Sequence, residues 1–186
     1  MNKSTKLYFV AIIPPPSMRE EVMHLKSFCA EKYASKAALR SPAHITLHMP
    51  FAFREDRIET LIATMKEIAI GQKSFHVEHC GFGCFEPRVI YIDVQLTEAL
   101  AELRTHTVSS MRKKLGLLNA DYKNDGFHPH MTIAFRDLKK PMFHKAWEEF
   151  ENKHFEQSWD CNAISLLKHD GQVWHIAQDF PFTIEK

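Results

Sequence analysis

The chain has 186 residues, of which 45% are hydrophobic and 25% are charged, a composition typical of one soluble globular domain. No segment approaches the roughly 20 apolar residues that span a membrane, and three prolines end the short apolar run 7–13, which is unlike a signal peptide. We therefore expect a cytoplasmic protein with no membrane partner. The 24 basic and 23 acidic residues nearly cancel, which argues against an extended contact with duplex DNA.

The first part of the chain alternates between strand and helix patterns. β-rich runs indicate strands, and apolar residues at spacings of three and four indicate helices. Ser17 could cap the first helix and Gly71 could end the second. The expected elements are a strand at 7–13, a helix at 17–33, a strand at 44–51, a helix at 58–69 and a strand at 75–82.

The second part of the chain repeats this order. Asp170-Gly171 is a strong signal for a hairpin turn between the last two strands. The expected elements are a strand at 89–96, a helix at 97–115, a strand at 130–135, a helix at 142–154 and strands at 159–167 and 173–180.

The repeated order indicates a duplication. Several elements superpose when the chain is shifted by the 86 positions that separate His44 from His130. We expect an α+β fold with duplicated β-α-β-α-β halves and two mainly antiparallel sheets around a central cleft. The chain would form a single bilobal domain over residues 1–186, with approximate lobes at 1–86 and 87–186. An α+β domain without duplication is the alternative.

Two of the expected strands carry a histidine and a threonine two residues apart. Side chains alternate across a strand, so each strand has an apolar and a polar face. The apolar faces comprise Ile45, Leu47 and Met49 in one strand and Met131, Ile133 and Phe135 in the other; the polar faces comprise His44, Thr46 and His48, and His128, His130 and Thr132. In a pseudo-twofold arrangement the two polar faces can oppose each other across a cleft.

A pair of imidazoles suits the opening of a phosphodiester. The reaction needs a base for the attacking oxygen and an acid for the departing one, and histidine serves either way near neutral pH. The threonine hydroxyls can donate hydrogen bonds to the phosphoryl oxygens. The residues alone leave open which of His44 and His130 is the base.

The pair His44-Ile45-Thr46-Leu47 and His130-Met131-Thr132-Ile133 resembles the 2H phosphoesterase superfamily, and within it the bacterial 2′-5′ RNA ligase-like branch, which includes cyclic phosphodiesterases. The trailing Met49-Pro50-Phe51, and Leu166-Leu167-Lys168 followed by Trp174, are similar to that branch as well.

The resemblance implies a bilobal fold and a metal-independent phosphodiesterase with no cofactor. Its substrate would be a nucleotide or an RNA end with a 2′,3′-cyclic phosphate or a 2′-5′ linkage, and reversible RNA ligation is a further activity of the branch. It implies catalytic roles for His44 and His130 and phosphate binding by Thr46 and Thr132. For cyclic phosphate hydrolysis it implies that His130 is the base. We expect a monomer.

Other residues have two interpretations each. Lys168 could add positive charge to the phosphate site or could be an exposed lysine before a turn. Phe51, Phe53 and Phe135 could stack on a nucleobase, although their spacing favours core packing. The cysteines form no C-x-x-C pair, so we expect reduced, buried thiols at Cys29, Cys80, Cys84 and Cys161.

Two rival functions remain. A metal-dependent hydrolase could use His44, His48, His128 and His130, or a cluster of His76, Glu78, His79, Cys80 and Cys84, although neither set has the spacing of a standard zinc motif. A non-catalytic module for RNA or nucleotides could keep the cleft without the chemistry.

Overall fold

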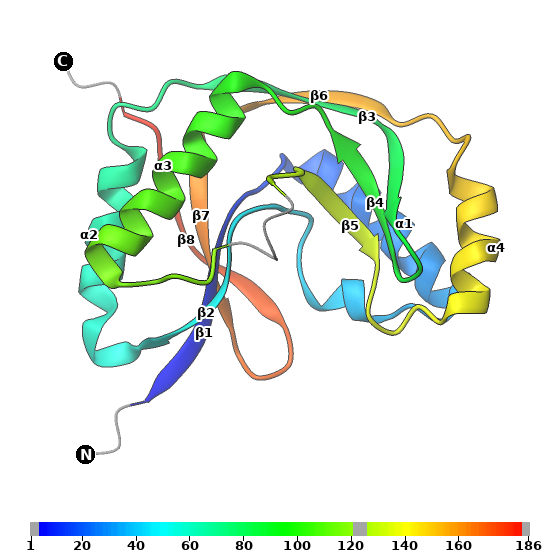
Figure 1. The fold of residues 1–186 in the computed structure, drawn as a ribbon, viewed down its shortest axis with the longest axis horizontal. Coiled ribbons are helices and arrows are strands. Elements are labelled where there is room, and N and C mark those ends of the chain that lie inside the picture. The colour runs from blue at the N-terminus through cyan, green and yellow to red at the C-terminus, as the bar shows by residue number, and fades with distance from the viewer. Residues whose placement is uncertain (1–3, 121–125, 184–186) are drawn as a thin grey trace.

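A computed structural model describes residues 4–120 and 126–183. Helices and strands alternate along most of the chain, as the sequence predicted (Figure 1). In chain order the elements are β1 (Thr5–Ile12), α1 (Pro16–Tyr33), η1 (Ala37–Arg40), β2 (Ile45–Arg54), η2 (Glu55–Arg57), α2 (Ile58–Ala69), β3 (Phe75–Phe85), β4 (Val89–Val94), α3 (Glu98–Leu115), β5 (His130–Ala134), α4 (Lys140–Phe150), β6 (Glu156–Cys161), β7 (Ala163–His169) and β8 (Trp174–Pro181).

The strands form two four-stranded sheets. One has the order β2-β1-β7-β8 and the other the order β5-β4-β3-β6, with antiparallel pairing between all neighbouring strands. Helices α2 and α3 pack on the first sheet, and α1 and α4 pack on the second (Figure 1). The expected α+β fold with two antiparallel sheets is therefore confirmed.

The order of elements supports the duplication and adds an exchange. Each half runs β-α-β-α-β, from β1 to β3 and from β4 to β6. However, β3 pairs with β4 of the second half, because a tight hairpin joins the two strands, and β7 returns to pair with β1. The first sheet thus joins β1 and β2 of the first half to β7 and β8, which follow the second half, and the second sheet joins β3 of the first half to β4, β5 and β6.

The edge strands of the two sheets occupy equivalent positions. β2 pairs with β1 at the edge of the first sheet, and β5 pairs with β4 at the edge of the second. The two edge strands also contact each other. Both strands with a histidine and a threonine therefore lie where the sheets meet.

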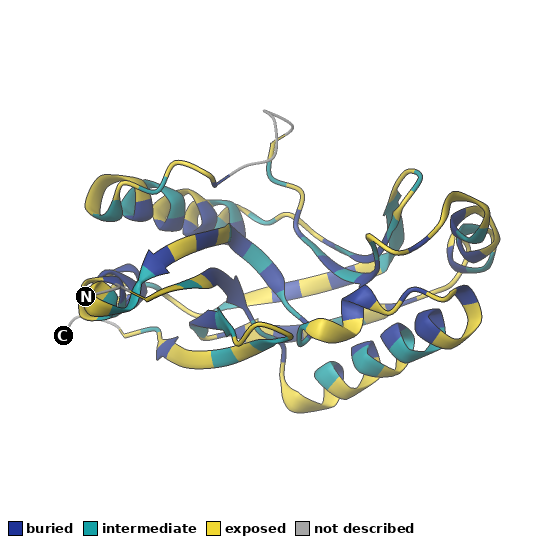
Figure 2. Ribbon diagram, turned by 90° about the horizontal axis from the view of Figure 1, so that it is seen from below, coloured by how far each residue is buried: buried dark blue, intermediate teal, exposed yellow. Residues whose placement is uncertain are grey.

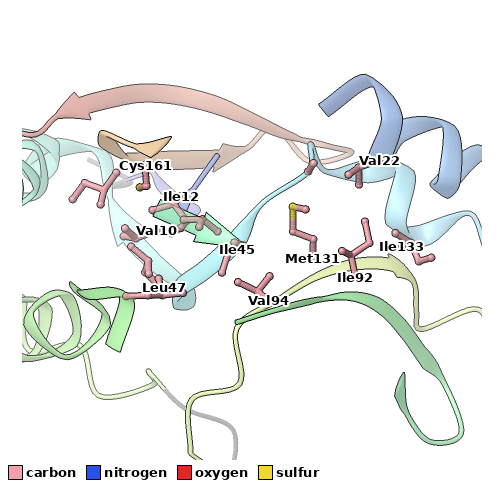
Figure 3. Packing of buried hydrophobic residues seen from close by; sticks show 14 of the residues in the cluster. Val10, Ile12, Val22, Ile45, Leu47, Ile92, Val94, Met131, Ile133 and Cys161 are labelled. Atoms are coloured by element: carbon pink, nitrogen blue, oxygen red, sulfur yellow. The ribbon is translucent and has the colours of Figure 1, made fainter. Parts of the chain in front are cut away.

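One hydrophobic core runs through both sheets. Val10, Ile12, Ile45 and Leu47 of the first sheet and Ile92 of the second belong to the same buried cluster (Figure 3). Buried and exposed residues alternate along the first part of β3, as expected for side chains that point to opposite faces, whereas β1 is buried on both faces from Tyr8 to Ile12 (Figure 2). A smaller cluster of Phe9, Ala11 and Leu167 lies on the other face of the first sheet, with Ile13, Trp174 and Ile176 packed against it.

Three expectations differ from the structure. The strand expected at 159–167 is divided at Asn162 into β6 and β7, which belong to different sheets. Helix α1 begins at Pro16, with Pro15 rather than Ser17 as N-cap, because the fixed φ of proline suits the first helical position. All four cysteines are free, but only two are buried; Cys80 is exposed and Cys84 is half-buried.

No helix in the described part of the chain is long and apolar enough to span a membrane.

Candidate active site

His44 lies directly before β2, half-buried on the face of the first sheet that carries Phe9. Its ring packs against Phe9, with 4.8 Å between the ring centroids. The Nδ1 atom is 2.8 Å from the backbone oxygen of Pro42. Because a carbonyl oxygen can only accept, Nδ1 carries the proton, and in the neutral ring Nε2 holds the lone pair.

His130 begins β5 and has the same local geometry. Its Nδ1 atom is 2.7 Å from the backbone oxygen of His128, again two residues earlier in the chain. The ring packs against both Tyr91 and Phe85, at centroid distances of 5.0 and 5.2 Å. Both histidines thus donate Nδ1–H to the second preceding carbonyl, which leaves Nε2 of each ring for proton transfer.

Burial lowers the pKa of both imidazoles. The pKa of His44 is lowered to about 4, first by burial and then by the charges of Lys26 and His130, against an opposing hydrogen bond to Pro42. The pKa of His130 is also lowered, mainly by burial; the hydrogen bond to His128 and the carboxylate of Asp93 oppose this shift. Both rings therefore favour the neutral form before a substrate binds.

The two threonines lie on the same faces as the two histidines. Thr46 pairs directly with Ala11, and Thr132 pairs directly with Tyr91. Directly paired residues on antiparallel strands share a face, so Thr46 belongs to the face of Phe9 and Ala11. Both threonines are half-buried, and each can offer a hydroxyl beside the histidine of its strand.

His48 does not lie on the polar face expected for it. Its side chain is fully buried and its ring packs on Phe51. The reason is an irregular register, because the pairing of β1 with β2 shifts twice between Thr46 and Phe51. Each β-bulge inserts an extra residue and breaks the period of two on which the expectation rested.

Lys168 lies away from the histidines. It pairs with Tyr8, whereas its neighbour Leu167 pairs with Phe9, so Lys168 points to the face opposite His44. Its Nζ atom lies 3.0 Å from Oε2 of Glu55, and Oε1 of the same carboxylate accepts a hydrogen bond from Tyr8. We therefore leave Lys168 out of the phosphate site.

Aromatic side chains flank both histidines. Beside His44, Phe9 contacts Trp174 at 4.7 Å, and Trp174 contacts His169 at 4.8 Å between ring centroids. Phe51 and Phe53, by contrast, are buried in the core, and Phe135 is half-buried. The group of Phe9, Trp174 and His169 forms only in the tertiary structure, because these residues come from three different strands.

A second aromatic group lies beside His130. Tyr91 contacts Phe85 at 4.6 Å, and its hydroxyl lies 3.0 Å from Nε2 of His128. The same Nε2 lies 3.2 Å from Asp93, the direct partner of His130 on β4. Phe85 is 40% exposed, so its ring is accessible to a ligand.

The clusters considered for metal binding do not assemble. Within residues 4–120 and 126–183, no three or more histidine, cysteine, aspartate or glutamate side chains converge as metal ligands would. His76 instead forms an ion pair with Asp160, and His79 accepts a hydrogen bond from Trp159. These two histidines of the second proposed cluster are thus engaged separately.

Comparisons with known proteins agree with this fold. Residues 14–173 match the model of the 2′-5′ RNA ligase superfamily. Two relatives named provisionally as phosphoesterases, from Geobacillus sp. strain WCH70 and Bacillus cytotoxicus, are 28% and 30% identical over 93% and 92% of this chain and 94% of each relative. The structure of Escherichia coli LigT with 3′-AMP superposes with a TM-score of 0.69 over 97% of this chain and 99% of LigT, and its 18% identity makes this a likeness of fold alone. The chain thus belongs to the 2′-5′ RNA ligase superfamily of 2H phosphoesterases.

Proposed function

We propose that this phosphoesterase is a metal-independent phosphodiesterase that opens 2′,3′-cyclic phosphate or 2′-5′ linkages of nucleotides or RNA ends. The observation that carries this proposal is the matched pair of imidazoles. Each ring is fixed through Nδ1 by a backbone carbonyl at 2.8 or 2.7 Å, and the two strands that carry the rings contact each other. Such an arrangement suits one base and one acid on opposite sides of a phosphorus atom.

The chemistry needs no group beyond the two rings and water. One neutral Nε2 takes a proton from the attacking water as its oxygen bonds to phosphorus. The other ring, protonated at Nε2, donates its proton to the ribose oxygen that leaves. A bound phosphate anion raises the pKa of both rings above their depressed values in the free protein, which favours the singly protonated pair.

The threonines support binding of the phosphate. Thr46 and Thr132 lie one on each motif strand, two residues after their histidines. Their hydroxyls can donate to the non-bridging phosphoryl oxygens and hold the phosphorus in line between the two rings.

The aromatic groups favour a substrate with a nucleobase. Phe85 and Tyr91 beside His130, and Trp174 near His44, offer ring faces or edges on which bases stack. Crystals of LigT contain 3′-AMP or ATP, which are ligands of this type. For this chain we infer a nucleotide or the end of an RNA strand.

The test is hydrolysis of a nucleoside 2′,3′-cyclic phosphate and of a 2′-5′ linked dinucleotide by purified protein in excess chelator. We expect turnover by the native chain and a loss on the order of 10²-fold or more in His44→Ala and His130→Ala. His154→Ala, at a site away from both motif strands, is the matched control. Substrate binding without any turnover would favour the non-catalytic module, and turnover that the chelator abolishes would favour the metal-dependent rival.

A further inference from the structure

Lys26 is a buried cation that no step above uses. It lies in α1 and its side chain is only 1% exposed. Its Nζ atom donates to the backbone oxygens of Ser41 and Pro42, at 2.8 and 3.2 Å. Among the described residues no carboxylate forms an ion pair with it, and burial alone lowers its pKa to about 8. Burial of an ammonium ion without a carboxylate lowers the stability of the fold, and this cost points to a role for Lys26 beyond packing.

Lys26 shares an acceptor with His44. The carbonyl of Pro42 accepts one hydrogen bond from Nζ of Lys26 and another from Nδ1 of His44. The ammonium ion therefore fixes the carbonyl that orients the imidazole. Its positive charge also lies close enough to disfavour protonation of that imidazole.

His130 has different charged neighbours from His44. The carbonyl of His128 takes the place of that of Pro42, and no ammonium ion of the described segments acts on His130: the His128 imidazole disfavours its protonation, and the carboxylate of Asp93, its direct strand partner, favours it. Two rings with the same local geometry therefore experience different fields. The charged groups that act on His44 are Lys26 from α1 and His130 from β5, and those that act on His130 are Asp93 from β4 and His128.

We propose that Lys26 is a positioning residue that makes the two histidines unequal, so that His44 is the general base and His130 the general acid in hydrolysis. This inference rests on the proposed function and reverses the roles that the family resemblance implied. Water attacks phosphorus on the side of His44 and loses a proton to its Nε2. The bond to the ribose oxygen breaks on the side of His130, whose Nε2–H supplies the proton.

The pH dependence of kcat/KM in Lys26→Met tests this assignment. Removal of the positive charge makes His44 easier to protonate. If His44 is the base, the acid limb of the profile moves to higher pH, by on the order of one unit, and the alkaline limb stays in place. Movement of the alkaline limb instead would make His44 the acid, and an unchanged profile would remove Lys26 from the mechanism; either result overturns the proposal.

Lys26→Gln is a second test variant, and Lys66→Met is the control. Glutamine keeps an N–H donor for the two carbonyls but lacks the positive charge, so Lys26→Gln should shift the acid limb as Lys26→Met does. It replaces Lys26→Met in the test if that variant does not fold. Lys66 is exposed on α2, on the far side of the first sheet, and its loss should leave both limbs unchanged.

An NMR titration of the His44 ring separates this inference from the proposed function. The ring should titrate at higher pH in both Lys26 variants than in the native chain, whatever substrate the protein hydrolyses. An unchanged ring pKa would overturn the role of Lys26. A shifted ring pKa in a protein without phosphodiesterase activity would confirm the coupling and refute the proposed function, and with it the assignment of His44 as base.

Discussion

The orientation of each imidazole is set by a single backbone hydrogen bond. In the sequence His44 and His130 share only the threonine two residues later; in the structure they also share an Nδ1 contact with the carbonyl two residues earlier. That contact selects one tautomer and restricts rotation of the ring. The histidine and threonine of each motif can then act together on one phosphoryl group.

Substitution by valine separates the contribution of each threonine hydroxyl from that of the branched side chain. Thr46→Val and Thr132→Val keep the branched side chain but remove the donor. We expect each to lower kcat/KM by about 10- to 100-fold, the value of a hydrogen bond to a charged group. Steady-state kinetics in chelator measure this, and Thr→Ser at either position should restore most of the rate.

Thr60→Val is the control for the threonine variants. Thr60 is exposed on α2, away from both motif strands, so its replacement should not change the kinetics. Native kinetics in both Thr46→Val and Thr132→Val would show that the hydroxyls do not bind the phosphate.

The β3–β4 hairpin places an aromatic ring beside His130. Gly83 pairs directly with Tyr91, and the Tyr91 ring lies over the glycine because no Cβ occupies that space. The ring there contacts His130 and forms a hydrogen bond with His128. One residue without a side chain on β3 thus determines the surroundings of a histidine on β5.

Gly83→Ala should displace that ring. A Cβ at this position would lie 2.4 Å from Cε2 of Tyr91, well inside contact distance. We expect a folded protein destabilised by about 1–3 kcal/mol through overpacking, with kcat/KM lowered by about 10- to 100-fold because His130 loses its support. Thermal unfolding and steady-state kinetics measure the two effects.

A double variant shows whether Tyr91 carries the effect. In a Tyr91→Ala background the added methyl group meets no ring, so Gly83→Ala should cause no further loss. An equal loss in both backgrounds would mean that the substitution acts elsewhere.

At the scale of the molecule, one core unites two sheets that exchange strands between the halves. Helix α1 follows β1 in the chain but packs on β5, and so it delivers Lys26 to the carbonyl beside His44. The buried ammonium ion makes the stability of the whole fold depend on pH.

The pKa of Lys26 falls from 10.5 in the unfolded chain to about 8 in the fold. Between pH 8 and 10.5 Lys26 binds fewer protons in the folded state than in the unfolded state. The contribution of Lys26 to the free energy of unfolding therefore rises over this pH range. Below pH 8 the full penalty, ~3 kcal/mol, is present.

Denaturant unfolding of the native chain and Lys26→Met between pH 7 and 10.5 measures this penalty. We expect the native chain to gain stability relative to the variant as pH rises. The difference between the two proteins isolates Lys26, because the buried tyrosines and cysteines, whose pKa values are raised in the fold, are present in both. A constant difference across this range would show that Lys26 titrates normally in the fold.

Much of the fold could be predicted from local patterns. Helix α2 occupies residues 58–69 as expected, and the order of strands and helices agrees with the periodicity of apolar residues. The two motif strands and their histidines and threonines were also identified from this periodicity. These features depend on residues close together in the chain, which a sequence displays directly.

Tertiary structure alone decided the rest. His48 became buried because bulges in β2 shift the register, and Lys168 turned away because the register with β1 assigns its face. Lys26, Tyr91 and Trp174 approach the histidines from elements that are distant in the chain. The sequence determined which residues can carry protons, whereas strand exchange and packing decided which charges surround them, since a field depends on distance in space.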